Sequence, residues 1–492
     1  MNPTSPSFMP ARCFSAGIFL YFLLHLLIRV GFSDSLELDE AEQWLFAQWL
    51  DWGYSSQPPL YTWLLKAFFS VLGESIFTLA LVKNLCLLVL YAATFRLALQ
   101  VLGDDKRAVL AALSLLLMPP VAWEASRDLT HTILVACWVP VSFLIVLQLL
   151  ERPVTRGYVM LGGVIGLGFL SKYNFSLHCL ALLLSLMSLP QGRRLLLDKR
   201  VFLSLLLAGL LYAPQGFWML EHQAALSRGL VKLGLTDRHN PAFLGKLGLA
   251  VAAYTAPLVL MAALIWGVRQ PAGQNPPTKS LAVRVLERYF LSLSLVLLLG
   301  VWFIEGGHLK TRWLFPFMAV FPVWLFARIP VAYLTPMRTR AYLASIGGTA
   351  GLILLLMLFR VPGASLTQKP TDLNLPFAAV AHDLRQAGFQ QGLIVAANPH
   401  MGGNLRYQFR EQVQVITPHL GFHLPGKLKG QPVLLFWEAE KEARMPSLLR
   451  EFARNELQLD VDAIEPRYLL HPYRYSDHLI SKMAYVSVKP GS

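Results

Sequence analysis

Long apolar runs alternate with short polar connections over the first three quarters of the chain, and this pattern predicts membrane-spanning helices. At about 20 apolar residues for each crossing, about eleven spans are expected, near 14–32, 76–101, 108–124, 131–150, 157–171, 174–190, 201–219, 243–267, 289–304, 312–328 and 341–360. The apolar run Leu60–Gly73 is too short to cross. We expect it to form a helix at the membrane interface, packed beside the polar segment that precedes it.

The pattern changes after residue 360, where VPGASLTQKP (361–370) has the composition of a linker. Beyond it, polarity is that of a soluble domain. Helical periodicity at 375–387, 404–409 and 445–455 alternates with strand-like runs at 392–397, 414–417, 433–437 and 485–488. We therefore predict a polytopic α-helical membrane domain over 1–360, followed by a small α/β domain over 371–492.

Composition narrows the class of protein. With 55% hydrophobic and 15% charged residues, the chain is too apolar for an ordinary soluble protein. The net charge of +14 comes mostly from short loops between apolar runs, such as 103–107, 151–156 and 191–200. Basic loops stay in the cytoplasm, so this distribution predicts a cytoplasmic N-terminus and an external C-terminal domain, and argues against a nucleic-acid partner. The four cysteines lie in or beside apolar runs, which supports neither a disulfide framework nor a thiolate metal site.

The segment between the first apolar run and Leu60 is acidic. Residues 33–57 contain no Lys or Arg but carry six acids, Asp34, Glu37, Asp39, Glu40, Glu42 and Asp51. Such a loop is free to cross the membrane, so we place 33–60 on the outer face. Helical spacing puts Ala41, Trp44, Leu45, Trp49 and Trp52 on one side, which is typical of a helix lying in the membrane interface.

Asp39 and Glu40 form a carboxylate pair at the start of this predicted helix. A carboxylate here could accept a proton from a substrate hydroxyl as a general base. The same residues allow a structural interpretation, because Asp39-x-x-Glu42 also has the spacing of a helix capping box. The residues taken alone support both interpretations about equally.

Three short motifs in this region carry a resemblance: Asp39-Glu40, Trp52-Gly53-Tyr54 and Gln57-Pro58-Pro59-Leu60. Their order and spacing resemble bacterial membrane glycosyltransferases of family 39, relatives of the protein O-mannosyltransferases and the lipid A aminoarabinose transferases. Later segments are similar too, namely GLGFLSKYN (166–174), TRWLFPF (311–317) and GGNLRYQF (402–409). The resemblance covers nearly the whole chain.

The resemblance implies a GT-C type fold and inverting transfer of a sugar from a polyprenyl-phosphate donor to a lipid, glycan or protein acceptor. The reaction would take place at the outer face of a bacterial inner membrane. It also implies that Asp39 is the catalytic base and that Glu40 supports it or binds a metal. Gln57 departs from the family, in which His or Lys often stands before Pro-Pro, so a charged contact to the donor phosphate would be lost there. A turn residue is the alternative for Gln57.

Positive charge for a phosphate could come from GGHLKTRW, where His308, Lys310 and Arg312 precede a predicted span. Basic residues in an outer loop run against the charge rule, and a lipid-linked phosphate would explain them. Snorkelling to ordinary headgroups is the alternative. Relatives have an Arg-Trp that resembles Arg312-Trp313, which favours phosphate binding.

A second outer loop, WEASRDLTH, contributes Arg127, Asp128 and His131. Many relatives have an acidic residue near the position of His131, so Asp128 is the candidate for a second carboxylate. A surface pair of Arg127 and Asp128 without function is the alternative, since exposed pairs contribute little. Lys172 is a further outward-facing cation, or it snorkels.

No pair of histidines has the spacing of a zinc motif, so a divalent ion held by Asp39 or Glu40 is the metal site left open. The rival function is a transporter or flippase for a lipid-linked sugar, which would place charged residues in the middle of spans. The polar residues singled out here cluster at span ends, which favours surface chemistry. The C-terminal domain lacks a comparable carboxylate pair, so we expect it to recognise the acceptor.

Overall fold

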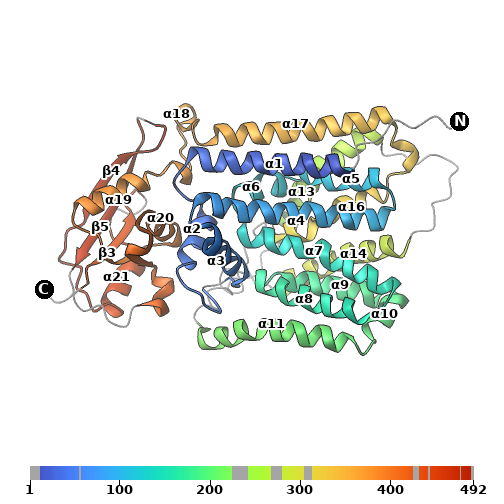
Figure 1. Cartoon of the computed structure of the whole chain (residues 1–492), viewed down its shortest axis with the longest axis horizontal. Helices are drawn as coiled ribbons and strands as arrows, with labels where there is room; N and C mark the ends of the chain where they lie inside the picture. The colour runs from blue at the N-terminus through green and yellow to red at the C-terminus, as the bar shows by residue number, and fades with distance from the viewer. Residues whose placement is uncertain are drawn as a thin grey trace. The chain divides into compact units, whose positions relative to one another are not determined.

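The computed structural model describes residues 11–54, 57–223, 242–267, 280–303, 313–424, 431–440, 444–476 and 478–488. The chain divides into two compact units (Figure 1). The first consists of residues 1–24, 56–61 and 83–353, and the second of residues 25–55, 62–82 and 354–492. The second unit therefore joins the acidic loop and one end of each of three membrane helices to the C-terminal domain.

Helices make up the first unit. Over the described residues of the whole chain, six helices are long and apolar enough to cross a membrane. They are α1 (Ala11–Phe32), α4 (Ile76–Leu102), α7 (Thr130–Glu151), α11 (Val201–Glu221), α13 (Ala242–Trp266) and α17 (Pro336–Arg360). The number is eight if each of two bent pairs is counted as one span: α5 (Asp105–Leu113) with α6 (Ala125–Arg127), and α9 (Phe175–Met187) with α10 (Pro190–Leu196). α8 (Thr155–Ser171) and α14 (Leu281–Phe303) are further helices of this unit. The expected number of eleven spans stays a prediction.

Three of the expected spans are not straight helices. The stretch 108–124 bends by 73° and 174–190 by 118°. The stretch 312–328 contains two short helices, α15 (Phe315–Met318) and α16 (Phe321–Phe326). Proline stands at each of these breaks, at Pro120, Pro190, Pro316 and Pro322. Proline lacks the N–H that would continue a helix, so it begins a new helical segment.

Small residues bring α8 and α11 together. A Cβ on Gly162 would lie 2.6 Å from the carbonyl oxygen of Ser204, and the Ser204 hydroxyl donates to the carbonyl of Tyr158 at 2.7 Å. Close backbone contact of this kind is the usual way in which membrane helices associate. Gly166, the first residue of GLGFLSKYN, has the same packing role, since a Cβ there would lie 3.2 Å from the Cα of Ala208 in α11.

The second unit is built on a five-stranded sheet with the order β2-β1-β3-β5-β4. Strands β2 (Val413–Ile416), β1 (Gly392–Ala396) and β3 (Val433–Glu438) are parallel, whereas β5 (Ile480–Val488) is antiparallel to both β3 and β4 (Arg467–Pro472). Its helices are α19 (Phe377–Gln386), α20 (Pro399–Phe409) and α21 (Ser447–Asn455), with the short α18 (Ala364–Thr367) after α17. This confirms the predicted α/β domain. Strand β4 was not predicted, because it is a largely exposed edge strand and lacks a continuous buried pattern.

The acidic loop contributes to the core of this domain. Leu45, Phe46 and Tyr54 belong to the same buried apolar cluster as the strands. The side-chain amide of Gln48 donates to the carbonyl of Val415 at 2.8 Å and accepts its N–H at 3.1 Å, so it satisfies the free edge of β2. The loop and the C-terminal domain therefore lie on the same side of the membrane.

A helix of the loop, α2 (Leu38–Phe46), packs against α20 (Figure 1). A Cβ on Gly403 would lie 1.9 Å from the carbonyl oxygen of Ala41, and one on Gly402 would lie 3.3 Å from the Leu45 side chain. The two glycines of GGNLRYQF thus permit backbone contact between the helices. On its other side α2 meets α3 (Leu60–Leu72), where the hydroxyl of Thr62 donates to Gln43 at 2.6 Å.

Gly403→Ala should separate α2 from α20, because the added methyl group would overlap the backbone of Ala41. Overpacking of this kind costs about 1–3 kcal/mol, so we expect a lower thermal unfolding midpoint in detergent. Gly31→Ala is the control, since Gly31 belongs to the same unit and a Cβ there would meet no atom within 4 Å. Equal midpoints for the two variants would contradict the close packing.

Candidate active site

The helix that carries Asp39 begins two residues earlier than the predicted capping box requires. Its N-cap is Glu37, with an extended backbone, and Glu40 is the third helical residue. The carboxylate of Glu40 accepts the backbone N–H of Glu37 at 3.2 Å. The predicted Asp39–Glu42 box is therefore wrong: Glu37 and Glu40 form the reciprocal pair, and Asp39 lies inside the first turn.

Glu40 is also held by an arginine. Its carboxylate accepts hydrogen bonds from Arg29 of α1, at 2.6 Å from Nη2 and at 3.1 and 3.2 Å from Nε. The Glu40 side chain is 1% exposed and that of Arg29 is 10% exposed. Arg29 also donates to the carbonyls of Ser33 and Ser35, so it fixes the turn between α1 and α2.

Two further acids of the loop have arginine partners from other elements. Glu37 pairs with Arg360, the last residue of α17, and Asp34 pairs with Arg474 at 2.7 Å. Asp34, Glu37 and Glu40 follow one another at intervals of three residues, and each meets a different segment of the second unit. Much of the acidity of this loop therefore serves to position it.

Two side chains of α20 form hydrogen bonds with the backbone just before α2. Asn404 accepts the N–H of Leu36 at 2.8 Å and donates to its carbonyl at 3.3 Å, and His400 donates to the same carbonyl at 2.9 Å. Both side chains are buried. The segment that leads into Asp39 is thus held by α20 on one side and by Arg29 on the other.

The apolar side of α2 faces protein, not lipid as predicted. Trp44 is buried, with its ring 4.9 Å from Tyr407 and 4.7 Å from Phe69. The helix ends at Phe46, so Trp49 and Trp52 lie beyond it. Trp49 stacks on His423 at 4.0 Å, and Trp52 is 55% exposed. An amphipathic pattern shows which side is buried but not what covers it.

The Trp-Gly-Tyr segment closes the loop. Tyr54 stacks on Phe46 at 5.5 Å, and its hydroxyl donates to the carbonyl of Trp49 at 3.0 Å. Burial raises the pKa of Tyr54 to about 12, so the hydroxyl remains a donor at neutral pH. This motif packs the end of the loop against α2, before the chain continues to α3.

Asp39 itself is half-buried in the first turn of α2, within the second unit. A negative side chain is favoured at this end of a helix by the backbone dipole. Among the described residues, no three His, Cys, Asp or Glu side chains gather in a way that could hold a metal ion. Both oxygens of Glu40 are bound by Arg29, so its clearest role is to position α2.

The candidates of the second outer loop belong to the first unit. Asp128 follows α6, Arg127 lies over the ring of Trp123 at 5.5 Å, and His131 is buried in the first turn of α7. Lys172 donates to the hydroxyl of Thr132 at 2.6 Å, so it is tied to the same turn of α7. Gln57, also in this unit, is half-buried before Pro58.

Sequence reasoning missed Lys83 in this group. Its ammonium donates to the carbonyl of Arg127 at 2.8 Å, and the residue is 3% exposed. A lysine within an otherwise apolar span was the available signal, because such charges are expensive in a membrane. His308, Lys310 and Arg312 lie outside the described residues, so their phosphate role stays a prediction.

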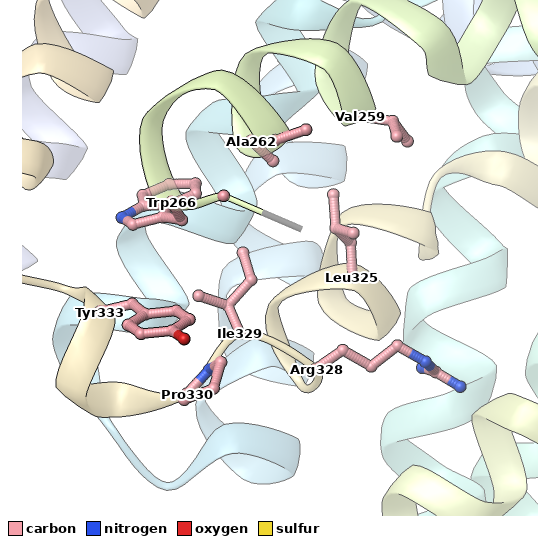
Figure 2. A pocket seen from close by; sticks show the side chains of 10 residues that line it. Val259, Ala262, Trp266, Leu325, Arg328, Ile329, Pro330 and Tyr333 are labelled. Atoms are coloured by element: carbon pink, nitrogen blue, oxygen red, sulfur yellow. The ribbon is translucent and has the colours of Figure 1, made fainter. Parts of the chain in front are cut away.

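A cavity of about 290 Å³ lies between the ends of α13 and α16 in the first unit (Figure 2). Its walls are mostly apolar, with Trp266, Ile329 and Tyr333 among them. Arg328, which lines this cavity, pairs with Glu287 at 2.6 Å and stacks over Trp324 at 3.6 Å. Among the residues that the structure describes, none of the predicted site residues lines this cavity.

Comparison with known proteins supports the family resemblance that the sequence motifs indicate. The family described as dolichyl-phosphate-mannose-protein mannosyltransferase matches residues 56–218. The chain is 32% identical over 444 residues to the lipopolysaccharide core galacturonosyltransferase RgtA of Rhizobium johnstonii, covering 87% of each protein. With RgtB of the same organism it shares 31% over 472 residues, covering 92% of this chain and 93% of that one.

A likeness to a solved structure extends over nearly the whole fold. The crystal structure of ArnT from Cupriavidus metallidurans bound to undecaprenyl phosphate aligns with a TM-score of 0.64 at 13% identity. The alignment covers 96% of this chain and 97% of ArnT. At this identity the likeness speaks for the fold alone.

Glu40→Gln should destabilise the protein, because it leaves the largely buried Arg29 charge without its partner. Breaking a buried pair costs about 3–5 kcal/mol, and Arg29→Gln should cost a similar amount. The double variant should lose clearly less than the sum of the two, which a double-mutant cycle of unfolding midpoints would measure. Glu287→Gln, at the more exposed pair with Arg328, is the control. Additive losses at Arg29 and Glu40 would contradict the coupling.

Proposed function

Because the chain belongs to the family 39 membrane glycosyltransferases of the GT-C fold, we propose that it moves galacturonic acid from a polyprenyl-phosphate donor to a sugar of the lipopolysaccharide core. The observation that carries this proposal is the 32% identity to RgtA over 87% of both proteins. The competing transporter function finds no support among these relatives.

The chemistry requires a base and a stabilised leaving group. In the proposed reaction the oxygen of an acceptor hydroxyl attacks the anomeric carbon, and the bond from that carbon to the phosphate oxygen breaks with inversion. The hydroxyl proton passes to the carboxylate of Asp39, and the bonding electron pair leaves with polyprenyl phosphate. Glu40 and Arg29 fix the position of α2, and with it that of Asp39.

Cations would stabilise the departing phosphate. Arg312 is our first candidate, since its guanidinium can bind two phosphate oxygens, with Lys310 and His308 beside it in the sequence. Lys172, Lys83 and Arg127 are cationic side chains of the first unit that could serve the same purpose. Gln57 would contribute a neutral hydrogen bond, and Asp128 is the reserve candidate for the base.

The direct test is an assay of the purified protein with a panel of radiolabelled polyprenyl-phosphate sugars and lipopolysaccharide core acceptor. We expect transfer from the galacturonic acid donor and little from the mannose and aminoarabinose donors. Efficient transfer of another sugar would refute the substrate assignment while leaving the glycosyltransferase family intact.

Asp39→Asn tests the catalytic residue. The change preserves size and removes the proton-accepting charge, so activity should fall by about 10²–10⁴-fold if Asp39 is the general base. Because Asp39 is neither the N-cap nor part of the capping pair, the unfolding midpoint should change little. The Asp39→Asn and wild-type proteins are compared in the same donor-release assay. Near wild-type turnover by a folded variant would move the search to Asp128.

The side of the membrane is a separate proposal, motivated by the basic loops. Alkaline phosphatase fused after Ser365 should be active, and a fusion after Asn275 should be silent, because only external phosphatase folds. The reverse pattern of activities would place the acidic loop and the C-terminal domain in the cytoplasm.

A further inference from the structure

One edge of the C-terminal domain is tied to the points where two membrane helices end. In the turn between β4 and β5, the N–H of Arg474 donates to the carbonyl of Asn374 at 2.8 Å. The Asn374 amide in turn donates to the carbonyls of Arg474 and Val361, each at 2.9 Å. The hydroxyl of Tyr475 reaches the carbonyl of Phe32, the last residue of α1, at 3.4 Å.

These hydrogen bonds fix the position of the β4–β5 turn relative to the ends of α1 and α17. α1 ends at Phe32 and α17 at Arg360, and both helices are long and apolar enough to span a membrane. A segment bonded to Phe32 and, through Asn374, to Val361 must lie close to the surface at which both helices leave the bilayer. All of these residues belong to the second unit.

Apolar side chains are exposed at this same edge of the domain. Leu366, on α18 directly after α17, is 87% exposed, Ile480 is 49% exposed and Tyr475 is 40% exposed. In the β4–β5 ladder Ile480 stands opposite Pro472, and Leu470, 61% exposed, lies on the same face as Pro472. Isolated apolar residues are normal on a surface, but a group beside two span ends is not.

The opposite face of the hairpin is covered. His471, between Leu470 and Pro472, points to the other face, where its Nε2 lies 2.9 Å from Asp383 of α19. Ser481 of β5 is buried and donates to the carbonyl of His471 at 3.0 Å. The hairpin therefore has a protein-facing side and an uncovered apolar side.

Tyr475 has a backbone conformation that tyrosine rarely adopts, with φ at +62°. The left-handed region is sterically unfavourable for a residue with a Cβ. Here it presents an exposed ring with the Arg474 guanidinium 5.3 Å from its centre. Tyrosine and arginine side chains of this kind are enriched where protein meets the headgroups of a bilayer.

We propose that α18 and the tip of the β4–β5 hairpin form a membrane-contact surface, with Leu366, Tyr475 and Ile480 in the interfacial zone of the leaflet at which α1 and α17 end. Basic side chains near it, Lys369, Arg474 and Lys482, suit anionic phospholipid headgroups. Two acids near it are engaged, since Asp34 pairs with Arg474 and Glu440 accepts from Tyr473 and from the Lys482 backbone. The surface sets the height of the domain, and with it that of α2, above the bilayer.

The test uses the full-length protein in nanodiscs of phosphatidylethanolamine and phosphatidylglycerol that contain a lipid with a photoactivatable diazirine. Peptide mapping after illumination should find lipid adducts at Leu366 and across Tyr475–Ile480. Leu448 of α21, 43% exposed in the same domain, is the internal control and should carry none. Adducts at Leu366 and Ile480 no more frequent than at Leu448 would overturn the proposal.

A pair of matched variants separates lipid contact from chance labelling. Ile480→Glu places a charge in the interface and should reduce lipid adducts at the hairpin several-fold. Leu448→Glu should leave them unchanged. Both positions are exposed, so both proteins should fold, which the unfolding midpoint checks. Undiminished hairpin adducts in folded Ile480→Glu would also count against the proposal. Neither measurement depends on catalysis, so the result is independent of the proposed function.

Discussion

The ion pair between Arg29 and Glu40 is the interaction on which the rest of the second unit depends. Glu40 is 1% exposed, and a carboxylate buried to that degree is stable only with a hydrogen-bonded partner of opposite charge. Arg29 supplies that partner from the last turn of the first membrane helix and also binds two carbonyls of the turn. The helix that carries Asp39 is thereby fixed directly to a membrane span.

The C-terminal domain completes the same arrangement from the other side. Gly403 allows its helix α20 to contact the backbone of α2, and Asn404 and His400 bind Leu36, just before it. The sequence predicts that this domain helps to recognise the acceptor without supplying the chemistry. The structure shows in addition that it forms one core with the acidic loop, so its removal would leave Leu45, Phe46 and Tyr54 without their packing partners.

The distribution of charge in the loop has a consequence for chemistry. Asp34, Glu37 and Glu40 each have an arginine partner, which offsets their charge within the fold. Asp39 is held between two of these fixed positions in the first turn of a short helix. In the role proposed for Asp39, a base needs a defined direction more than a concentration of negative charge, and the positions of the paired glutamates would supply that direction.

The sequence by itself determined the class of protein and the presence of an α/β domain, because these follow from long apolar runs and from period, and its short motifs indicated the family. It placed Asp39 on a helix but could not choose the residue that caps it, since Glu37–Glu40 and Asp39–Glu42 have the same spacing. Tertiary structure decided that question through Arg29 and Arg360, which come from helices far apart in the chain. It also decided that the tryptophan side of α2 faces α20 and α3, because a hydrophobic pattern records only that a surface is buried.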